Sequence, residues 1–301
     1  MSFHPRPQRN PGPGWGFAFL LWAEHWWPRW FFRPLLMAGT WVGVASMPGQ
    51  RAHSRAYLEV VLGRSPRWIE IWRHFFAFTD LLILNLRTGR GAPVKCQLTP
   101  GNKDAFETLL RSSQPALFGT FHFGCSDLLG YLLGAQGRRV SIIRLQVGNS
   151  EDTRLLGQRY SDNVSFLWIN NPATMLFDLK DAIESGASLA LKCDRLEYSA
   201  KTAAFRFLGG NRIFPVTIYH LAILFGLPVV FCIAIPGNLP DEIDVFASPI
   251  FLPDSALNRD ENLQEAHRHF QTVLDELETK VRQYPFLWFN FLPLNPLTSD
   301  Q

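Results

Sequence analysis

Charged residues are scarce in this chain of 301 residues. Asp, Glu, Lys and Arg make up 18% of it, whereas hydrophobic residues make up 47%. A disordered protein has the opposite balance, so this composition excludes one and indicates a large buried core. The length suits one large α/β domain or two small ones.

Cysteine is also rare, and its few copies lie far apart. The four cysteines form no CxxC pair and no Cys/His cluster. This spacing excludes a disulfide framework and a zinc site, and it favours a reducing compartment. No stretch resembles a P-loop, a dinucleotide fingerprint or a metal motif, so we expect neither a cofactor nor a metal ion.

A long apolar run is missing too. Residues Trp15–Ala23 are apolar, but charged residues and prolines interrupt the stretch after Ala23, and the next run, Leu35–Met47, has only 13 residues. A free-standing transmembrane helix needs about 20 residues. We therefore expect residues 15–47 to form a monotopic hairpin or an interfacial helix pair, with a short tilted span as the alternative. A secretory signal peptide is disfavoured, because Trp26-Trp27 stands where a small-residue cleavage site is needed.

The charge that is present is unevenly distributed. Residues 1–100 hold 12 basic and 4 acidic residues, a balance of +8, and the remaining chain holds 17 and 22, a balance of −5. The same first hundred residues hold 8 of the 10 tryptophans. Arginine interleaved with tryptophan indicates contact with an anionic membrane surface. Two alternatives are a nucleic-acid patch, disfavoured because the tryptophans accompany long aliphatic residues, and an aromatic core with arginines on its rim.

The chain divides into three parts by pattern. Residues 1–14 are rich in Pro, Gly and Arg and are expected to be mobile, and residues 15–93 are expected to form a membrane-associated helical segment that includes helices at 54–62 and 66–86. Residues 94–301 alternate between short apolar strands and helices, which predicts an α/β domain with a largely parallel sheet covered by helices on both faces. The expected strands are Ala116–Phe121, Val140–Leu145, Val164–Ile169, Ser188–Lys192, Pro228–Ile235 and Ile243–Phe246. The expected helices are Asn102–Ser112, Asp127–Leu133, Thr153–Tyr160, Ala173–Ser185, Pro215–Phe225 and Asp260–Gln283.

A histidine directly follows the strand expected at 116–121. Sites in parallel sheets lie beyond the carboxyl ends of the strands, which is where His122 falls. We expect His122 in the turn and Asp127 at the start of the next helix, with the carboxylate folded back onto Nδ1 so that the other nitrogen takes a proton from a hydroxyl. The small residue Gly124 leaves room for a substrate. The alternative is a buried histidine bonded to a helix-capping aspartate.

Two rival nucleophiles lie in the same turn. Ser126 lacks the G-x-S-x-G elbow of hydrolases, and Cys125 lies three residues from His122. A lipid esterase or thioesterase using either residue is therefore an alternative, as is a lipid-binding protein without catalysis.

Three more polar residues are expected at the same edge of the sheet. Arg144 lies near the end of one predicted strand, and Asp194-Arg195 follow another. Guanidinium groups there could hold a phosphate or a developing oxyanion. A surface ion pair of Asp194 with Arg206 or Lys201 is the alternative. Residues 207–210 form either a tight turn beside a ligand or a plain hairpin.

These residues together resemble a known family. The motif is His122-Phe123-Gly124-Cys125-Ser126-Asp127, of the form H-x4-D, and it is joined by Arg144, Asp194-Arg195, Phe207-Leu208-Gly209 and the tail Tyr284-Pro285-Phe286-Leu287-Trp288-Phe289-Asn290-Phe291. The chain resembles the bacterial late lipid A acyltransferases (lauroyl/myristoyl transferases) of the lysophospholipid acyltransferase-like superfamily. Ser54-Arg55-Ala56-Tyr57-Leu58, Gly63-Arg64 and His74-Phe75-Phe76 resemble the branch associated with aryl polyene pathways.

The resemblance implies a function. It implies acyl transfer from acyl carrier protein, or from acyl-CoA, to a lipid hydroxyl at the cytoplasmic face of a bacterial inner membrane. His122 would be the general base, Asp127 its orienting partner, Arg144 the holder of the oxyanion or a phosphate, and Asp194 a supporting residue. Arg195 stands where the family usually has glutamine. The Phe-Pro-Glu-Gly motif of glycerolipid acyltransferases is absent, and this absence disfavours a glycerol-phosphate acceptor.

Overall fold

The computed structural model of the chain describes residues 14–144, 151–169, 174–196, 199, 201–239 and 241–297. In this part, seven strands form one sheet and two more form a hairpin. The strands are β1 (Lys95–Leu98), β2 (Leu117–Thr120), β3 (Val140–Arg144), β4 (Val164–Trp168), β5 (Ser188–Lys192), β6 (Thr202–Phe207), β7 (Gly210–Pro215), β8 (Val229–Pro236) and β9 (Glu242–Ala247). The helices are α1 (Gly14–Trp26), α2 (Arg29–Ser46), α3 (Pro48–Leu62), α4 (Trp68–Gly89), α5 (Lys103–Arg111), α6 (Ser126–Ala135), α7 (Glu151–Arg159), α8 (Met175–Glu184), α9 (Thr217–Phe225) and α10 (Arg259–Gln283).

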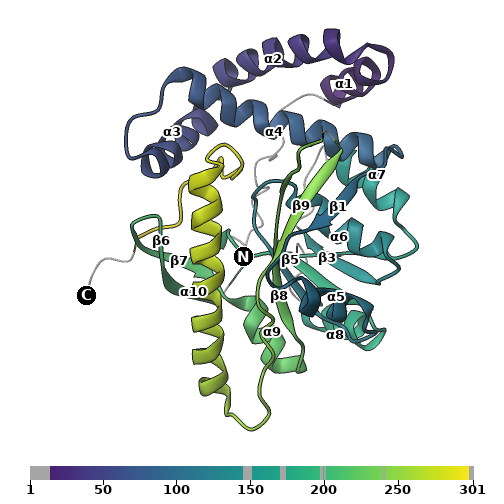
Figure 1. The fold of residues 1–301 in the computed structure, drawn as a ribbon, viewed down its shortest axis with the longest axis vertical. Coiled ribbons are helices and arrows are strands. Elements are labelled where there is room, and N and C mark those ends of the chain that lie inside the picture. Colours follow the sequence, from purple (N-terminus) through teal and green to yellow (C-terminus); the bar gives the residue numbers. More distant parts are fainter. Residues whose placement is uncertain are drawn as a thin grey trace.

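The large sheet is mostly parallel, with the order β1-β9-β8-β2-β5-β3-β4 (Figure 1). Strands β8, β2, β5, β3 and β4 run in one direction, whereas β9 is antiparallel to β8 and β1 is parallel to β9. The central strands β2 and β8 are buried along almost their whole length and are correspondingly apolar, as expected for strands covered on both faces. The predicted fold class is therefore confirmed.

The pleat of β2 divides the interior into two apolar cores. Leu117 lies in the core beneath α9, α10 and the β6–β7 hairpin, whereas Phe118 lies in the core beneath α5 and α6. Successive side chains of a strand point to opposite faces, so the same alternation continues at Gly119 and Thr120. Thr120 faces the α5–α6 side, where it lines a cavity.

The N-terminal helices α1 to α4 lie at the carboxyl ends of β8, β2, β5, β3 and β4. Helix α4 runs across this edge of the sheet, and α1 and α2 lie on its outer side (Figure 1). Arg87 near the end of α4 bridges Glu24 of α1 and Asp241 just before β9. A small apolar core that includes Phe32, Leu36, Ile83 and Leu86 joins α2 to α4.

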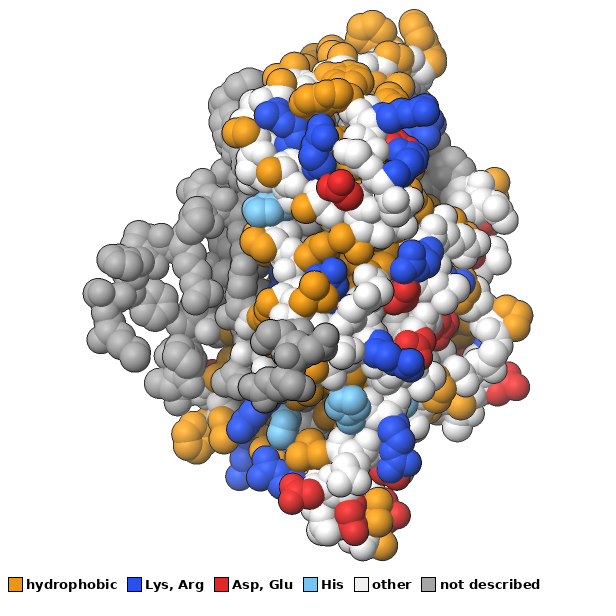
Figure 2. Space-filling model, turned by 90° about the vertical axis from the view of Figure 1, so that its left-hand side faces the viewer, with side chains coloured by type: hydrophobic (Ala, Val, Ile, Leu, Met, Phe, Trp, Pro, Cys, Tyr) orange, Lys and Arg blue, Asp and Glu red, His pale blue; other side chains and the backbone are white. Residues whose placement is uncertain are grey.

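The outer surface of α1 and α2 is apolar and aromatic. Its exposed side chains are Phe19, Trp22, Trp26, Trp30, Phe31, Leu35, Met37, Trp41 and Val42. Figure 2 shows hydrophobic side chains gathered at this end of the molecule, with Lys and Arg side chains next to them. Two of the nearby cations, Arg51 and Arg55, lie over the ring of Trp68. None of the helices within the described residues combines the length and apolarity that a membrane span requires.

Most predicted elements are present, with their ends shifted by a few residues. Strand β1 and the β6–β7 pair were not predicted as strands. Strand β1 is short and mostly exposed. Strand β6 buries only Phe205 and Phe207, near its end, so neither strand has a long apolar run. The turn at 207–210 is the plain hairpin, with Leu208 and Gly209 at φ 50° and 77°. The predicted mobile residues 1–13, the strand residue Leu145 and the helix residue Ala173 lie outside the described residues.

Candidate active site

The histidine lies where the strand pattern predicts it. Strand β2 ends at Thr120, His122 occupies the turn, and Asp127 lies in the first turn of α6. The side chain of His122 is 18% exposed, so its imidazole is largely enclosed but still reachable. Within the described residues its Nε2 makes no hydrogen bond.

Asp194, not Asp127, orients the imidazole. Asp194 Oδ1 lies 2.7 Å from His122 Nδ1, and Asp194 Oδ2 accepts from the His122 backbone N–H at 2.8 Å. The expected bond from Asp127 to Nδ1 is therefore wrong. Strands β2 and β5 are neighbours, with Thr120 opposite Lys192, so the residues that follow the two strands meet at the same edge.

Asp194 is held by several donors. Its Oδ2 also accepts from the indole N–H of Trp288 at 2.9 Å, and its backbone carbonyl accepts from Asn295 Nδ2 at 3.1 Å. The residue is 1% exposed, so the surface ion pair with Arg206 or Lys201 does not form. A buried carboxylate with its oxygens bonded by N–H groups keeps one geometry and its charge.

The electrostatics keep His122 neutral and Asp194 ionised. Burial, together with the positive charges of Arg195 and Lys192, lowers the pKa of His122 well below its usual value, against the opposing effect of Asp194. Burial opposes ionisation of Asp194, but His122, Arg195 and the Trp288 hydrogen bond hold the pKa of its carboxyl below the usual range. Because a carboxylate can only accept, neutral His122 carries its proton on Nδ1 and exposes the Nε2 lone pair.

Asp127 forms an ion pair at the edge of the same site. Its Oδ1 accepts from Lys192 Nζ at 2.7 Å. Burial opposes its ionisation, but the charges of Lys192 and Arg144 and the hydrogen bond from Lys192 hold its pKa below the usual range. Asp127 begins the helix that follows the turn of His122, and its carboxylate is bonded to Lys192 and not to His122 Nδ1.

Three cations surround the two carboxylates. Arg144 ends β3 and its Nη1 lies 3.4 Å from the hydroxyl of Tyr131. Arg195 Nη2 donates to the carbonyl of Phe289 at 3.3 Å, and its Nε is buried without a hydrogen-bond partner among the described residues. Arg144, Lys192 and Arg195 place three positive charges around Asp127 and Asp194, a setting that suits an anionic or oxyanionic ligand.

Gly124 was expected to leave room for a substrate, but in the structure it lets the turn approach β8 closely. Its φ is 55°, and a Cβ built on it would lie 1.9 Å from the carbonyl oxygen of Ala234 on β8. Its N–H donates to Leu287 O at 2.8 Å, so this N–H is occupied and does not serve as an oxyanion donor. The glycine lets the turn pack against β8, where the Cys125 N–H also donates to Ala234 O at 2.8 Å.

The two rival nucleophiles are poorly placed. Cys125 and Ser126 are 2% and 7% exposed. Burial, with the charge of Asp127, raises the pKa of the Cys125 thiol, which is the opposite of what a reactive thiolate needs. Among the described residues Ser126 Oγ makes no hydrogen bond to His122.

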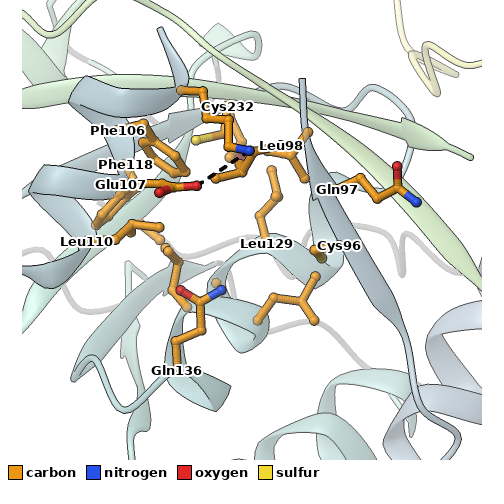
Figure 3. A pocket seen from close by; sticks show the side chains of 17 residues that line it. Cys96, Gln97, Leu98, Phe106, Glu107, Leu110, Phe118, Leu129, Gln136 and Cys232 are labelled. Carbon is orange, nitrogen blue, oxygen red and sulfur yellow. Dashed lines mark ion pairs between the residues drawn. The ribbon is translucent and has the colours of Figure 1, made fainter. Parts of the chain in front are cut away.

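A cavity of about 390 Å³ lies beside the site, between α5, α6 and the sheet, lined mainly by apolar side chains but also by Gln97 and Gln136. Figure 3 shows Phe106, Leu110, Phe118, Leu129 and Cys232 around it. The cavity reaches Thr120, two residues before His122, and its α6 wall belongs to the helix that carries Asp127. An ion pair between Lys103 and Glu107, 3.8 Å, lies at its rim on α5. Among the described residues, no group of His, Cys, Asp and Glu side chains is arranged to hold a metal ion.

Comparisons with known proteins find a distant likeness in structure alone. No protein-family model and no curated protein sequence matches this chain. Among solved structures, it is similar to the crystal structure of the 1-acyl-sn-glycerophosphate (LPA) acyltransferase PlsC from Thermotoga maritima. The two are 14% identical, with a TM-score of 0.36, over 81% of this chain and 96% of that chain. A likeness this remote says nothing about which residues act.

Two residues of the site were not assigned a role from the sequence. Lys192 ends β5 and pairs with Asp127, and Trp288 in the tail donates to Asp194. Lys192 closes an otherwise apolar strand, which is a signal that sequence reasoning can use. Trp288 lies 94 residues from Asp194, and no local pattern connects the two.

Proposed function

We propose that this protein is a membrane-associated O-acyltransferase. It moves a fatty acyl chain from acyl carrier protein or acyl-CoA to a hydroxyl of a lipid or glycolipid. The observation that carries this proposal is the 2.7 Å bond between His122 Nδ1 and Asp194 Oδ1 at the carboxyl edge of the sheet, next to an apolar cavity. The H-x4-D resemblance, in which His122 is the base, points to the same chemistry.

The imidazole of His122 supplies the proton transfers. Its Nε2 takes the proton of the acceptor hydroxyl while the hydroxyl oxygen attacks the carbonyl carbon of the acyl thioester. The tetrahedral intermediate collapses, the carbon–sulfur bond breaks, and the imidazolium returns the proton to the thiolate. Asp194 holds the ring in the Nδ1–H tautomer and stabilises the imidazolium, and Asp127 adds negative potential near it.

The cations of the site stabilise negative charge. The oxygen of the tetrahedral intermediate and the phosphates of either donor are anionic. Arg195 offers a buried Nε without a partner among the described residues, and Arg144 and Lys192 add positive potential at the same edge. We assign the oxyanion or the donor phosphate to this group of side chains.

The cavity between α5 and α6 suits the acyl chain. Its walls at Phe106, Phe118, Leu129 and Leu133 are apolar, and it reaches Thr120, two residues before His122. A chain bound there places its carbonyl carbon near the carboxyl edge of the sheet. The burial of each methylene contributes about 0.8 kcal/mol.

The acceptor comes from the membrane. The aromatic surface of α1 and α2, with arginines beside it, suits a bilayer interface, and α4 beneath it crosses the edge that carries His122 (Figures 1 and 2). A lipid hydroxyl at the interface is thus close to the base. The family resemblance assigns the protein to the cytoplasmic face of a bacterial inner membrane, with a lipid A precursor, an aryl polyene lipid or another glycolipid as acceptor.

A single substitution tests the proposal. His122→Ala removes the base, so we expect transfer of a dodecanoyl group from acyl carrier protein to total cell lipids to fall at least about 10³-fold, with folding and membrane binding retained. His220→Ala, a histidine on α9 away from the site, is the control and keeps full transfer. Full activity in folded His122→Ala would overturn the proposal. Mass spectrometry of total lipids from cells with and without the protein identifies the acceptor and the chain.

The same assay separates transfer from hydrolysis. A hydrolase releases free fatty acid without an acceptor, and that release is lost in Ser126→Ala or Cys125→Ala. We expect both variants to retain transfer. Loss of transfer in either one, with the fold intact, would assign the chemistry to that residue.

A further inference from the structure

A chain of buried hydrogen bonds runs from the N-terminal helices to His122. Ser54 Oγ on α3 lies 2.8 Å from His74 Nδ1 on α4, and His74 Nε2 lies 2.9 Å from the carbonyl oxygen of Trp288. The indole N–H of Trp288 donates to Asp194 Oδ2 at 2.9 Å, and Asp194 Oδ1 accepts from His122 Nδ1. The four residues that lead to His122 in this series of hydrogen bonds (Ser54, His74, Trp288 and Asp194) are each at most 1% exposed. Water therefore does not compete for these bonds.

The acceptors determine where the protons lie. A carbonyl oxygen only accepts, so His74 Nε2 donates to Trp288, and Nδ1 of the neutral ring accepts from the Ser54 hydroxyl. Burial lowers the pKa of His74 to about 4, which keeps this ring neutral at physiological pH. With both imidazoles neutral, each bond in the chain has one donor and one acceptor, and no partner is left unsatisfied.

The tail segment that carries Trp288 is also bonded to the backbone around His122. Phe289 N–H donates to His122 O at 2.7 Å, and Gly124 N–H donates to Leu287 O at 2.8 Å. The two segments therefore form a short antiparallel bridge. One residue of the tail, Trp288, thus holds the carboxylate through its indole while its neighbours hold the backbone of the base.

The tail is anchored from the other side by the N-terminal helices. His74 bonds the Trp288 carbonyl and stacks on Phe291, with 4.5 Å between ring centroids. Tyr57 of α3 donates its hydroxyl to Pro285 O at 2.7 Å and packs edge-on against Trp288. Helices α3 and α4 therefore fix the tail, and the tail fixes Asp194.

We propose that Trp288 and His74 are positioning residues for His122, and that the C-terminal tail is part of the catalytic apparatus. This inference rests on the proposed acyl transfer. Neither residue touches the reacting atoms. Trp288 sets the position of the Asp194 carboxylate, and His74 sets the position of Trp288.

The first test compares two buried tryptophans. Trp288→Phe keeps an aromatic ring and removes the N–H that reaches Asp194, so we expect kcat to fall about 10- to 100-fold, with KM for dodecanoyl-acyl carrier protein within about threefold. Trp72→Phe is the matched control: Trp72 is also buried and donates its indole N–H to a carbonyl, that of Met37 at 3.3 Å, away from the site. We expect its kcat to stay at the wild-type value.

The second test needs no substrate. In nuclear magnetic resonance spectra of histidine labelled with ¹⁵N, wild-type His122 is expected as the neutral Nδ1–H tautomer, and Trp288→Phe is expected to add the Nε2–H form. Trp72→Phe is expected to leave the spectrum of His122 unchanged. If Trp288→Phe does not fold, the same two measurements are made on His74→Phe. That variant removes the hydrogen bond that holds the Trp288 carbonyl.

The outcomes separate this inference from the proposed function. A changed His122 tautomer in a protein without transfer activity supports the positioning role and rejects acyl transfer. An unchanged tautomer together with unchanged kcat overturns the positioning role and leaves acyl transfer in place. The double variant Trp288→Phe, His74→Phe should lose no more kcat than the worse single variant, because both act through Asp194. If the two losses in kcat multiply instead, Trp288 and His74 do not act through one series of hydrogen bonds.

Discussion

At the scale of single residues, two aspartates compete for the role of partner to His122. Asp194 contacts both the imidazole and the backbone of His122, whereas Asp127 pairs with Lys192. The H-x4-D resemblance assigns the orienting role to Asp127, and the geometry assigns it to Asp194. The difference matters because the orienting partner fixes the tautomer, on which the base depends.

Substitution of the two aspartates by asparagine distinguishes them. Asp194→Asn presents an amide to Nδ1 and removes the charge that stabilises the imidazolium, so we expect kcat to fall about 10³- to 10⁴-fold. Asp127→Asn weakens an ion pair at the edge of the site, and we expect a loss at least tenfold smaller than that. Steady-state kinetics of the two folded variants provide the measurement. The reverse order would return Asp127 to the orienting role.

Gly124 provides a second residue-scale prediction. In Gly124→Ala the new methyl group meets Ala234 O at 1.9 Å in a backbone of positive φ, so we expect a loss of about 3 kcal/mol or more in the free energy of unfolding. Gly63→Ala is the control, because Gly63 has φ 66° but open space around it. Its expected loss is about 1–2 kcal/mol, from the backbone conformation alone. Equal losses in denaturant unfolding would show that the contact with β8 is unimportant.

At the scale of elements, the packing of α5 and α6 on the sheet leaves the cavity open. Phe118, Ala190 and Cys232 project from β2, β5 and β8 toward these helices and line it. The three strands are adjacent in the sheet. The cavity is thus a product of strand order and helix placement, and its depth limits the length of chain it can hold.

Filling the cavity should shorten the preferred acyl chain. Cys232→Leu adds volume at the wall formed by β8, so we expect the donor preference to shift toward shorter chains, by about fourfold in kcat/KM per excluded methylene. Cys232→Ala leaves the cavity open and serves as the control. Competition between acyl carrier protein donors of different chain length measures the shift. An unchanged preference in folded Cys232→Leu would place the acyl chain elsewhere.

At the scale of the whole molecule, the end formed by α1 and α2 differs from the rest in its many exposed aromatic side chains. Trp26 and Trp30 on α1 and α2 are 68% and 76% exposed. Isolated exposed apolar residues are ordinary, but a contiguous aromatic surface over two helices is not. Helix α4 lies between this surface and His122, so a bilayer bound there would bring lipid headgroups toward the carboxyl edge of the sheet.

Vesicle binding tests this arrangement. The double variant Trp26→Ser, Trp30→Ser should bind anionic phospholipid vesicles at least about tenfold more weakly than the wild type, because two interfacial aromatic anchors are lost. Leu224→Ser, Leu252→Ser removes two similarly exposed apolar residues that lie away from α1 and α2, and it should bind normally. A co-sedimentation assay at low and high salt gives both the apolar and the ionic contributions. Equal loss in both double variants would argue against an oriented membrane face.

Local sequence patterns were enough to define most elements and the position of His122. Apolar runs of strand length alternating with helical patterns predict a largely parallel sheet, because local periodicity reports which face of each element is buried. The position of His122 after the strand that ends at Thr120 is predicted by the same pattern. Strand β1 and the β6–β7 hairpin were not predicted because β1 is almost wholly exposed and β6 buries only two side chains near its end, so neither has a long apolar run.

The partners of His122 can be identified only from the tertiary structure. Asp194 lies 72 residues away and meets His122 because β5 is next to β2, and the order of strands in a sheet depends on how the whole core packs. Trp288 and His74 reach the site from the tail and from α4, and both are distant from Asp194 in the sequence. Local patterns specify elements, whereas contacts between distant segments depend on the free energy of the whole molecule. The position of His122 could therefore be predicted from the sequence, but its hydrogen-bonded partners could not.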